Sequence, residues 1–264
     1  MELYGSDAEP LAPLVEAESL VVDPPELVLP RLVTCLRTTA PAEPARLLLS
    51  PDVVDCVSEA FLLESHLAEA VARDHLRVRE TPSRCADRAI LAADRAGVLV
   101  SVDRQTGVLP VDATPVIEGL YETYEPVWEA AEPLSVRAPP RDRLYETARE
   151  QLTDAFATQL EQALESASAL QWHGSPTPVE LVLAVAARTS THHYDLCAWA
   201  EAVGFTSRST VARTKQQLEK AGVIEVEPVP QERGRPRQQL LVGDERVGAA
   251  DAENLVPTLR RLPA

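Results

Sequence analysis

Lysine, aromatic residues and long apolar runs are all scarce in this chain. Only two of its 25 basic residues are lysine, and aromatic residues make up 4% of its 264 positions. The longest apolar runs fall far short of the roughly 18–20 residues that span a bilayer. The acidic first ten residues also lack the basic start of a signal peptide. We therefore expect a soluble cytoplasmic protein with no membrane partner, whose cores are filled by aliphatic residues and alanine.

The cysteines form no recognisable ligand pair. Cys35, Cys56, Cys85 and Cys197 lie far apart, without the CxxC spacing that is typical of zinc sites. We expect buried, reduced thiols, with neither a metal nor a cofactor. The sequence also offers no nucleophile, base and orienting group that together would define a catalytic site, so we expect no enzyme activity.

Carboxylates outnumber basic residues by a wide margin. The chain has 41 acidic residues, 25 basic residues and a formal net charge of −16. This composition is similar to that of proteins from salt-accumulating haloarchaea, in which carboxylates keep the surface hydrated while molar salt screens their repulsion. The alternative is an ordinary acidic bacterial protein from a GC-rich genome. We favour a halophilic archaeon.

Residues 1–135 alternate between strand-like and helix-like patterns. We expect a long helix that begins at Pro51, with Ser50 as its N-cap, and runs to about Val71. Other elements surround it: helix starts at Pro24 and Thr114, strands at 46–49 and 76–79, and a hairpin of 89–93 and 98–102 that turns at 94–97. The pattern predicts an α/β regulatory or effector domain with helices packed on a small mixed sheet.

Residues 136–172 are predicted to form a linker and a connecting helix. Pro139 and Pro140 mark a boundary, and apolar residues then recur at helical spacing from Leu144 to Leu170. A continuous helix of about 30 residues would be roughly 45 Å long. We expect this helix to form a homodimer through its apolar stripe, the alternative being a helix packed within its own chain. The last residues, 246–264, are expected to form a loose tail.

Residues 173–245 carry the pattern of a winged helix-turn-helix. Helices are expected at 178–188 and 194–203, and Gly204 should form the tight turn before a recognition helix. Two strands, 223–229 and 238–242, should then flank a tip that contains the sequence RGRPR. Although the whole chain is acidic, residues 205–237 hold seven basic residues against four acidic ones, both lysines included. Such a concentration of positive charge indicates a polyanion partner, which we take to be double-stranded DNA.

The candidate DNA-binding residues come from the recognition helix and from the hairpin tip. Residues in the first helical turns can reach base edges in a major groove, while a slim arginine-rich tip suits a narrow minor groove. Short hydroxyl side chains allow a close approach to the DNA backbone. The candidates are Ser207, Arg208, Ser209, Thr210, Arg213, Thr214 and Lys215 on the helix, and Arg233, Arg235 and Arg237 on the hairpin. The alternatives are a solvated loop for the tip and a protein-binding module for the helices.

Two segments resemble parts of known regulators. Residues 204–224 resemble the recognition helix of MarR-like and TrmB-like archaeal winged-helix regulators, and the GRPR sequence resembles their wing tip. The whole chain is similar to the haloarchaeal TbsP family of transcriptional regulators. That resemblance implies a sequence-specific regulator linked to genes of central carbon metabolism. It also matches Ser209, Thr210, Arg213, Arg235 and Arg237 to the DNA-contacting pattern of winged helices.

The sequence leaves the function of the N-terminal domain open. This domain faintly resembles the phospholipase D-like effector domains of archaeal regulators, but a catalytic HxK motif is excluded because no lysine precedes Lys215. Asp94 and Asp103, near strand ends, could contact a ligand, and turn chemistry explains them equally well. We expect the domain to sense a small-metabolite effector or to mediate assembly. The rival hypotheses are an adaptor whose winged helix binds protein and an unrecognised enzyme.

Overall fold

The chain folds into two compact units, Met1–Pro140 and Arg141–Ala264, and each is described by itself. The computed structural model describes residues 19–26, 28–39, 43–92, 95–102, 105–111, 113–166, 176–230 and 236–262. Within these ranges no helix is both long and apolar enough to cross a membrane.

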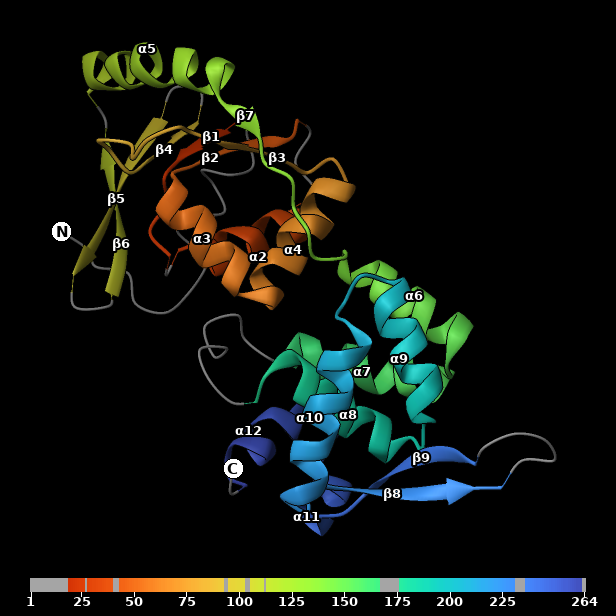
Figure 1. Cartoon of the computed structure of the whole chain (residues 1–264). Coiled ribbons are helices and arrows are strands. Elements are labelled where there is room, and N and C mark those ends of the chain that lie inside the picture. The colour runs from red at the N-terminus through yellow and green to blue at the C-terminus, as the bar shows by residue number, and fades with distance from the viewer. Residues whose placement is uncertain are drawn as a thin grey trace. The chain divides into compact units, whose positions relative to one another are not determined.

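A mixed sheet forms the centre of the N-terminal unit (Figure 1). Over the described residues it has seven strands in the order β6-β5-β4-β1-β2-β3-β7, of which β1, β2 and β3 pair in parallel. The strands are β1 (Ser19–Val22), β2 (Ala45–Leu49), β3 (Leu76–Glu80), β4 (Ala89–Ala92), β5 (Arg95–Val102), β6 (Gln105–Val111) and β7 (Glu132–Pro133). The expected mixed sheet is confirmed, but the sequence pattern does not predict β1, β6 or β7.

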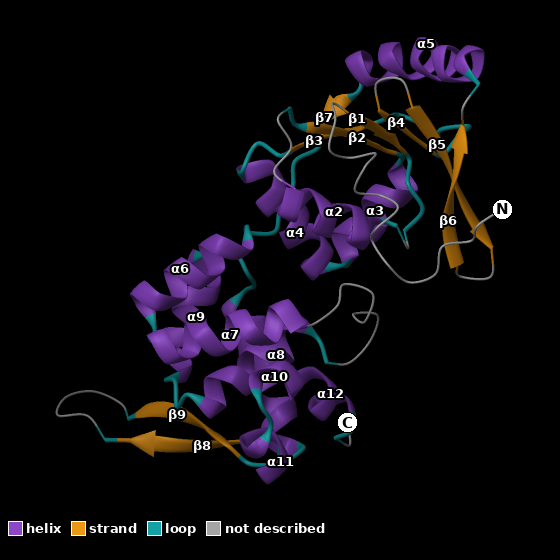
Figure 2. Cartoon of the chain, turned by 180° about the vertical axis from the view of Figure 1, so that it is seen from behind, coloured by secondary structure: helices purple, strands orange, loops and turns teal. Residues whose placement is uncertain are grey.

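Helices cover both faces of this sheet (Figure 2). One face carries α2 (Leu29–Thr39), α3 (Pro51–Glu59) and α4 (Phe61–Ala72), and the other face carries α5 (Thr114–Ala130). Strands β1 and β2 are therefore largely buried on both sides, which explains why their sequences are mostly apolar. In β3, by contrast, apolar and charged residues alternate, and Arg77 is exposed.

Side chains of β1 alternate between two hydrophobic clusters. Val21 belongs to the cluster beneath α2, α3 and α4, whereas Leu20 and Val22 belong to the cluster beneath α5. Successive side chains of an extended strand point to opposite faces, so one short strand supplies both cores. The helix α5 is held at its face by Trp128, whose ring centroid lies 4.7 Å from the guanidinium carbon of Arg79.

The long helix expected from Pro51 to Val71 is wrong, because the chain breaks it at Ala60. This residue has φ −104° and ψ 80°, outside the helical region, and separates α3 from α4. Ser50 does occupy the N-cap position, but no described backbone amide donates to its hydroxyl. The buried residues of α3 lie along one face, whereas α4 is buried continuously from Leu62 to Ala70.

The hairpin of β4 and β5 turns earlier than the sequence predicts. Ala92 pairs with Arg95, so residues 95–97 belong to β5 and not to the turn. The connection is thereby shortened to positions 93 and 94, and two-residue connections are the commonest in antiparallel hairpins. Asp94 and Asp103, the candidate ligand contacts, lie outside the described residues.

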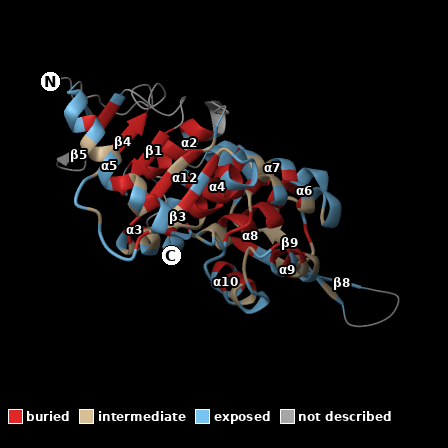
Figure 3. Cartoon of the chain, turned by 90° about the horizontal axis from the view of Figure 1, so that it is seen from above, coloured by how far each residue is buried: buried red, intermediate tan, exposed pale blue. Residues whose placement is uncertain are grey.

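The C-terminal unit contains the three helices that the sequence predicts, followed by two antiparallel strands. These are α8 (Pro178–Arg188), α9 (His193–Ala202), α10 (Arg208–Lys220), β8 (Ile224–Val229) and β9 (Arg237–Val242). Helix α8 is the most buried of the three (Figure 3). It begins at a capping box in which Thr177 accepts from the Glu180 amide while the Glu180 carboxylate accepts from the Thr177 amide.

Trp199 of α9 lies at the centre of this unit's core. Its side chain is fully buried, with ring centroids at 5.5 Å from Phe156 and 6.0 Å from Phe205. Its indole Nε1 donates to Thr147 Oγ1 at 3.0 Å, which supplies the partner that a buried indole N–H requires. These contacts fix α9 against the two helices that precede α8 in the chain.

The single connecting helix expected at 141–170 is wrong. The chain forms two helices there, α6 (Arg141–Gln151) and α7 (Asp154–Ser166). Thr153 starts the second by accepting a hydrogen bond from the Phe156 amide at 3.1 Å, as an N-cap does. The apolar stripe is buried within its own chain, with Leu144 1% exposed and Leu160 fully buried. It therefore gives no support to a coiled-coil seam between protomers.

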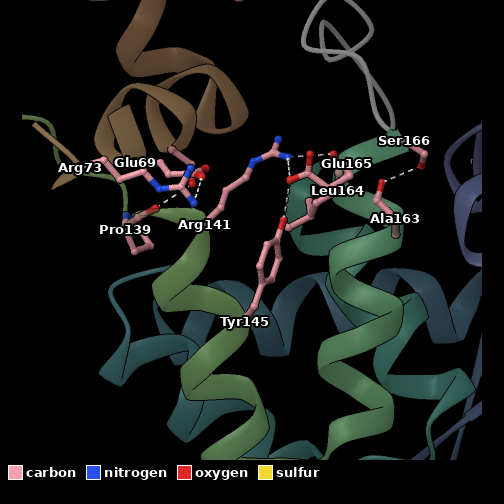
Figure 4. A network of polar contacts seen from close by, with 10 residues as sticks. Glu69, Arg73, Pro139, Arg141, Tyr145, Ala163, Leu164, Glu165 and Ser166 are labelled. Atoms are coloured by element: carbon pink, nitrogen blue, oxygen red, sulfur yellow. Dashed lines mark hydrogen bonds and ion pairs between the residues drawn. The ribbon is translucent and has the colours of Figure 1, made fainter. Parts of the chain in front are cut away.

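Polar contacts join the start of α6 to the end of α7 (Figure 4). Arg141 Nη1 donates to the Leu164 carbonyl at 3.1 Å and to the Glu165 carboxylate at 3.0 Å. The Tyr145 hydroxyl donates to the same carboxylate at 3.3 Å. The two helices thus fold back on each other as a pair.

The loose tail expected at 246–264 is also wrong. The segment forms α11 (Glu245–Ala249), a short 3₁₀ turn at Ala252–Asn254 and α12 (Leu255–Arg260). Val247 and Leu255 are fully buried. Arg188, at the end of α8, donates to the Val247 carbonyl at 2.7 Å and also to the Ala250 carbonyl. This arginine ties the last segment to the helical core.

Candidate nucleic-acid interface

Two glycines in the left-handed region shape the entry to and exit from α10. Gly204, at φ 79°, ends α9, and Gly222, at φ 72°, ends α10. After α9 the Phe205 amide donates to the Ala200 carbonyl at 2.9 Å. After α10 the Val223 amide donates to the Leu218 carbonyl, also at 2.9 Å. Such paired bonds around a left-handed glycine define a Schellman motif, which reverses the chain tightly. The predicted turn at Gly204 is confirmed.

Ser207 caps α10 and brings a row of hydroxyls to its start. Ser207 Oγ accepts from the Thr210 amide at 3.2 Å and lies 2.9 Å from the hydroxyl oxygens of both Ser209 and Thr210. Ser209 and Arg213 are exposed, and Thr210 is half-buried. The first two turns of α10 therefore present short polar groups and an arginine to the outside.

The structure corrects the expected placement of Thr214 and Lys215, which are buried and do not face outward. Each is only 7% exposed. Lys215 Nζ donates to Gln238 Oε1 at 3.1 Å and lies 3.7 Å from Glu219 Oε2. Val211, Thr214, Lys215 and Leu218 recur at helical spacing on one inward face, so the periodicity of the sequence already contained this information. Lys215 joins α10 to β9, while Lys220, the other lysine, is exposed.

Arg208 and Arg237 both lie close to an exposed tyrosine that the sequence interpretation missed. Tyr194, near the start of α9, is 59% exposed. Its ring centroid lies 5.9 Å from the guanidinium carbon of Arg208 and 5.8 Å from that of Arg237. Both arginines also meet a carboxylate of α9: Arg208 Nε is 2.6 Å from Glu201 Oε2, and Arg237 Nη1 is 3.2 Å from Asp195 Oδ2. No spacing in the sequence signals this cluster, because its members come from α9, α10 and β9.

The base of the β8–β9 hairpin packs tightly against the end of α10. A Cβ atom built on Gly243 would lie 2.6 Å from the Gly222 carbonyl oxygen, so only glycine fits there. The strands pair from Ile224 with Val242 to Val229 with Arg237. Arg233 and Arg235, at the predicted tip, lie outside the described residues.

On α9, the half-buried His193 lies beside the buried Cys197. The Cys197 Sγ atom lies 3.4 Å from His193 Nε2. Burial lowers the pKa of His193 below its ordinary value, and the positive charge of Lys215 lowers it further. Burial also raises the pKa of the Cys197 thiol. Burial therefore favours the neutral forms of both side chains.

The comparisons with known proteins divide the chain at the same place as its two compact units. Residues 12–139 match the family model "Transcriptional regulator TbsP-like, N-terminal", and residues 140–260 match "Transcriptional regulator TbsP-like, C-terminal HTH domain". The chain belongs to the TbsP-like family of transcriptional regulators. The resemblance drawn from its sequence is therefore confirmed, and so is a C-terminal helix-turn-helix domain.

Comparisons with curated proteins and with solved structures give no further information on function. No curated protein matches the chain. Among solved structures, one match is the structure of TrmBL2, described as an archaeal chromatin protein with a novel mode of DNA binding. It is 13% identical with a TM-score of 0.35, and the match covers 48% of this chain and 50% of that one. The matched part thus spans about half the length of that protein, and a similarity this low carries no argument.

Proposed function

We propose that the C-terminal unit is a winged helix that reads specific DNA sequences, with α10 in the major groove and the hairpin as the wing. The supporting observation is the surface of α10, where a capped first turn presents Arg208, Ser209 and Arg213 outward. The hairpin begins its return strand at Arg237 on the same side of the unit, since Arg208 and Arg237 share one tyrosine. Residues in the first turns of a recognition helix reach base edges, and a bidentate arginine favours guanine.

The proposed contacts fall into two groups. Ser209, Thr210 and Arg213 read bases from α10, and Arg233 with Arg235 enters the minor groove from the tip of the wing. Ser207 acts indirectly, by capping α10. Thr214 and Lys215 are buried and are assigned to packing.

The decisive experiment is selection of DNA from the genome of the source organism. The purified chain is incubated with sheared genomic fragments at near-molar potassium, and the retained fragments are sequenced. We expect a set of promoters that share one motif, and we expect Arg213→Ala to abolish their enrichment. Arg149→Ala, which removes an exposed arginine on α6, is the matched control and should leave the enrichment intact. If the folded wild-type chain enriches nothing, the protein-binding adaptor becomes the better explanation.

We further propose that the regulator acts as a homodimer on an inverted repeat, in a halophilic archaeon, at genes of central carbon metabolism. The dimer is supported by the way helix-turn-helix proteins read half-sites one helical turn apart, and no longer by the stripe of α6 and α7. The habitat is supported by the net charge of −16, and the target genes by the family resemblance. A palindromic motif in the selected promoters supports the dimer, and a monomeric mass in high-salt light scattering contradicts it.

We also propose that a small-metabolite effector binds the N-terminal unit at the carboxyl ends of its parallel strands. In open α/β sheets, ligands bind where such strands end and the strand order reverses. Asp23 follows β1 there, with φ 42°, and its Oδ1 accepts from the Ser50 amide at 3.0 Å. The other carboxylate oxygen and the Ser50 hydroxyl are buried, and neither has a hydrogen-bond partner among the residues that the structure describes. Thermal unfolding screened against small metabolites that carry hydroxyl or amino groups tests this site, and Asp23→Asn should weaken any stabilisation that a hit produces.

A further inference from the structure

The cluster of Tyr194, Arg208 and Arg237 is a candidate site for one DNA phosphate group. Its three side chains come from the start of α9, the start of α10 and the base of the hairpin. The tyrosine is 59% exposed, so its ring and hydroxyl are accessible to a ligand. The two guanidinium carbons lie 5.9 and 5.8 Å from its ring centroid, which places both cations around one aromatic side chain.

Both arginines are already paired with carboxylates, but these pairs are open to solvent. The side chains of Arg208 and Glu201 are 49% and 54% exposed, and those of Arg237 and Asp195 are 40% and 35% exposed. Ion pairs with this exposure contribute little to stability. A DNA phosphate group carries a negative charge and offers the arginines more acceptor oxygens than a carboxylate does, so it can replace the carboxylates.

We propose that Tyr194, Arg208 and Arg237 bind a backbone phosphate, and that Glu201 and Asp195 hold the two arginines until this phosphate displaces them. Tyr194 is thus a further DNA-contacting residue, and the two carboxylates are positioning residues. This proposal rests on the proposed function, since it supplies the backbone contact that places α10 in the groove. The start of α9 suits the role because the positive end of a helix dipole faces a phosphate favourably.

The exchange has a measurable consequence for salt dependence. An arginine that neutralises a phosphate releases counterions from DNA, which steepens the fall of log K with log salt by about 0.9 per phosphate contact. Here each displaced carboxylate takes up a cation in return, so part of that release is cancelled. Binding by the wild-type chain should therefore be less sensitive to salt than its number of basic contacts suggests.

Removing the two carboxylates tests the exchange directly. Glu201→Gln and Asp195→Asn keep the size of each side chain while they free the arginines. The probe is a fluorescent duplex of mixed sequence, about 30 base pairs long, titrated at several potassium concentrations. We expect each substitution to tighten binding roughly two- to fivefold at low salt, and the double variant to steepen the salt slope by up to about 0.9, the full contribution of one phosphate contact. Tyr194→Ala should weaken binding several-fold, and Tyr194→Phe should do so less.

The control must separate arginine release from a general loss of negative charge. Glu225→Gln removes an exposed carboxylate from β8 of the same hairpin. In an Arg208→Ala background, Glu201→Gln should gain no more affinity than Glu225→Gln does. Equal gains in affinity for Glu201→Gln and Glu225→Gln in every background would overturn the exchange. Such a result would mean that both carboxylates act only by repelling the DNA. Unaltered binding by Tyr194→Ala, with an unchanged unfolding temperature, would remove the tyrosine from the site.

The same titration distinguishes failure of this inference from failure of the proposed function. A folded wild-type chain that binds neither this duplex at low salt nor any genomic fragment at near-molar potassium refutes both. A wild-type chain that binds, whose salt slope and affinity do not respond to the carboxylate substitutions, refutes the exchange alone.

Discussion

Lys215 gives the sharpest test of which residues of α10 face DNA. Its side chain is 7% exposed and ends between Gln238 Oε1 at 3.1 Å and Glu219 Oε2 at 3.7 Å. Lys215→Ala removes three buried methylene groups beyond Cβ, and at about 0.8 kcal/mol for each group their loss costs about 2.4 kcal/mol. Release of the ammonium group from its buried position offsets part of this cost. Since Gln238 is exposed and the Glu219 side chain is 45% exposed, both partners regain water. We expect a net loss of about 1–2 kcal/mol.

Lys215→Met separates packing from charge. Methionine keeps the length and apolar volume of the lysine stem, so the free energy of unfolding should stay within about 1 kcal/mol of the wild-type value. Urea unfolding followed by circular dichroism measures this quantity, and hydrogen exchange of the α10 amides assigns the change to the C-terminal unit. The affinity for duplex DNA and its salt slope should not change.

Lys220→Met is the matched comparison, because Lys220 is exposed on the same helix. If Lys220 neutralises a flanking phosphate, its substitution lowers the salt slope by about 0.9. The burial argument fails if Lys215→Met loses that amount of slope while its stability stays the same. Such a result would mean that Lys215 leaves its internal partners and reaches DNA.

Three further predictions concern the framework of α9, α10 and the hairpin. The pKa of His193 is lowered in the folded state, so the unfolded chain binds more protons near the ordinary pKa of 6.5. The free energy of unfolding should therefore fall as the pH drops below about 6.5. His193→Gln should make this fall smaller, as measured by urea titrations at several pH values. Gly243→Ala places a Cβ 2.6 Å from the Gly222 carbonyl oxygen and should lower the free energy of unfolding by about 1–3 kcal/mol. Gly248→Ala, whose Cβ would lie 3.4 Å from its nearest neighbour, should be neutral or stabilising when both variants are compared by thermal unfolding. Ser207→Ala removes the cap of α10 and should cost about 1 kcal/mol, while Ser207→Asp should keep the stability and weaken DNA binding by charge; equal stability of Ser207→Ala and wild type would contradict the capping role.

The three helices α8, α9 and α10 could be predicted from sequence because their ends are set locally. Gly204 and Gly222 sit where the chain needs positive φ, and Thr177 and Ser207 form caps within three residues of themselves. Such signals depend on neighbours along the chain and not on the fold. The alternation of apolar segments in residues 1–135 predicted a mixed sheet with helices for the same reason.

The incorrect predictions concern helix breaks and side-chain clusters that are decided by tertiary packing. An apolar stripe from Leu144 to Leu170 has the same appearance whether it belongs to one long helix or to two that pack together. Only Thr153, a capping residue inside the stripe, could have indicated the break. Ala60 carries no such signal, although α3 and α4 on either side of it differ in burial. The cluster around Tyr194 was equally hidden, because three elements must fold before its members meet.

The inward face of α10 was a different kind of error. Its spacing of Val211, Thr214, Lys215 and Leu218 is visible in the sequence. Residue type misled there: a lysine in a basic segment of an acidic protein suggests a phosphate contact, although its position on the helix places it inside. Position on the helix should take precedence over charge when the two disagree.

The carboxylates beside Arg208 and Arg237 bear on how so acidic a chain binds DNA at all. A DNA-binding protein that depends on counterion release would lose affinity through Glu201 and Asp195, because these carboxylates compete for its arginines. At molar salt, however, counterion release supplies almost no affinity, and the competing carboxylates then cost little. In return they keep each guanidinium on the Tyr194 ring, close to the position where a phosphate would bind, and less side-chain freedom is lost on binding. The proposed exchange therefore lowers sensitivity to salt and preserves geometry, which is the combination that a DNA-binding protein needs where salt is high and variable.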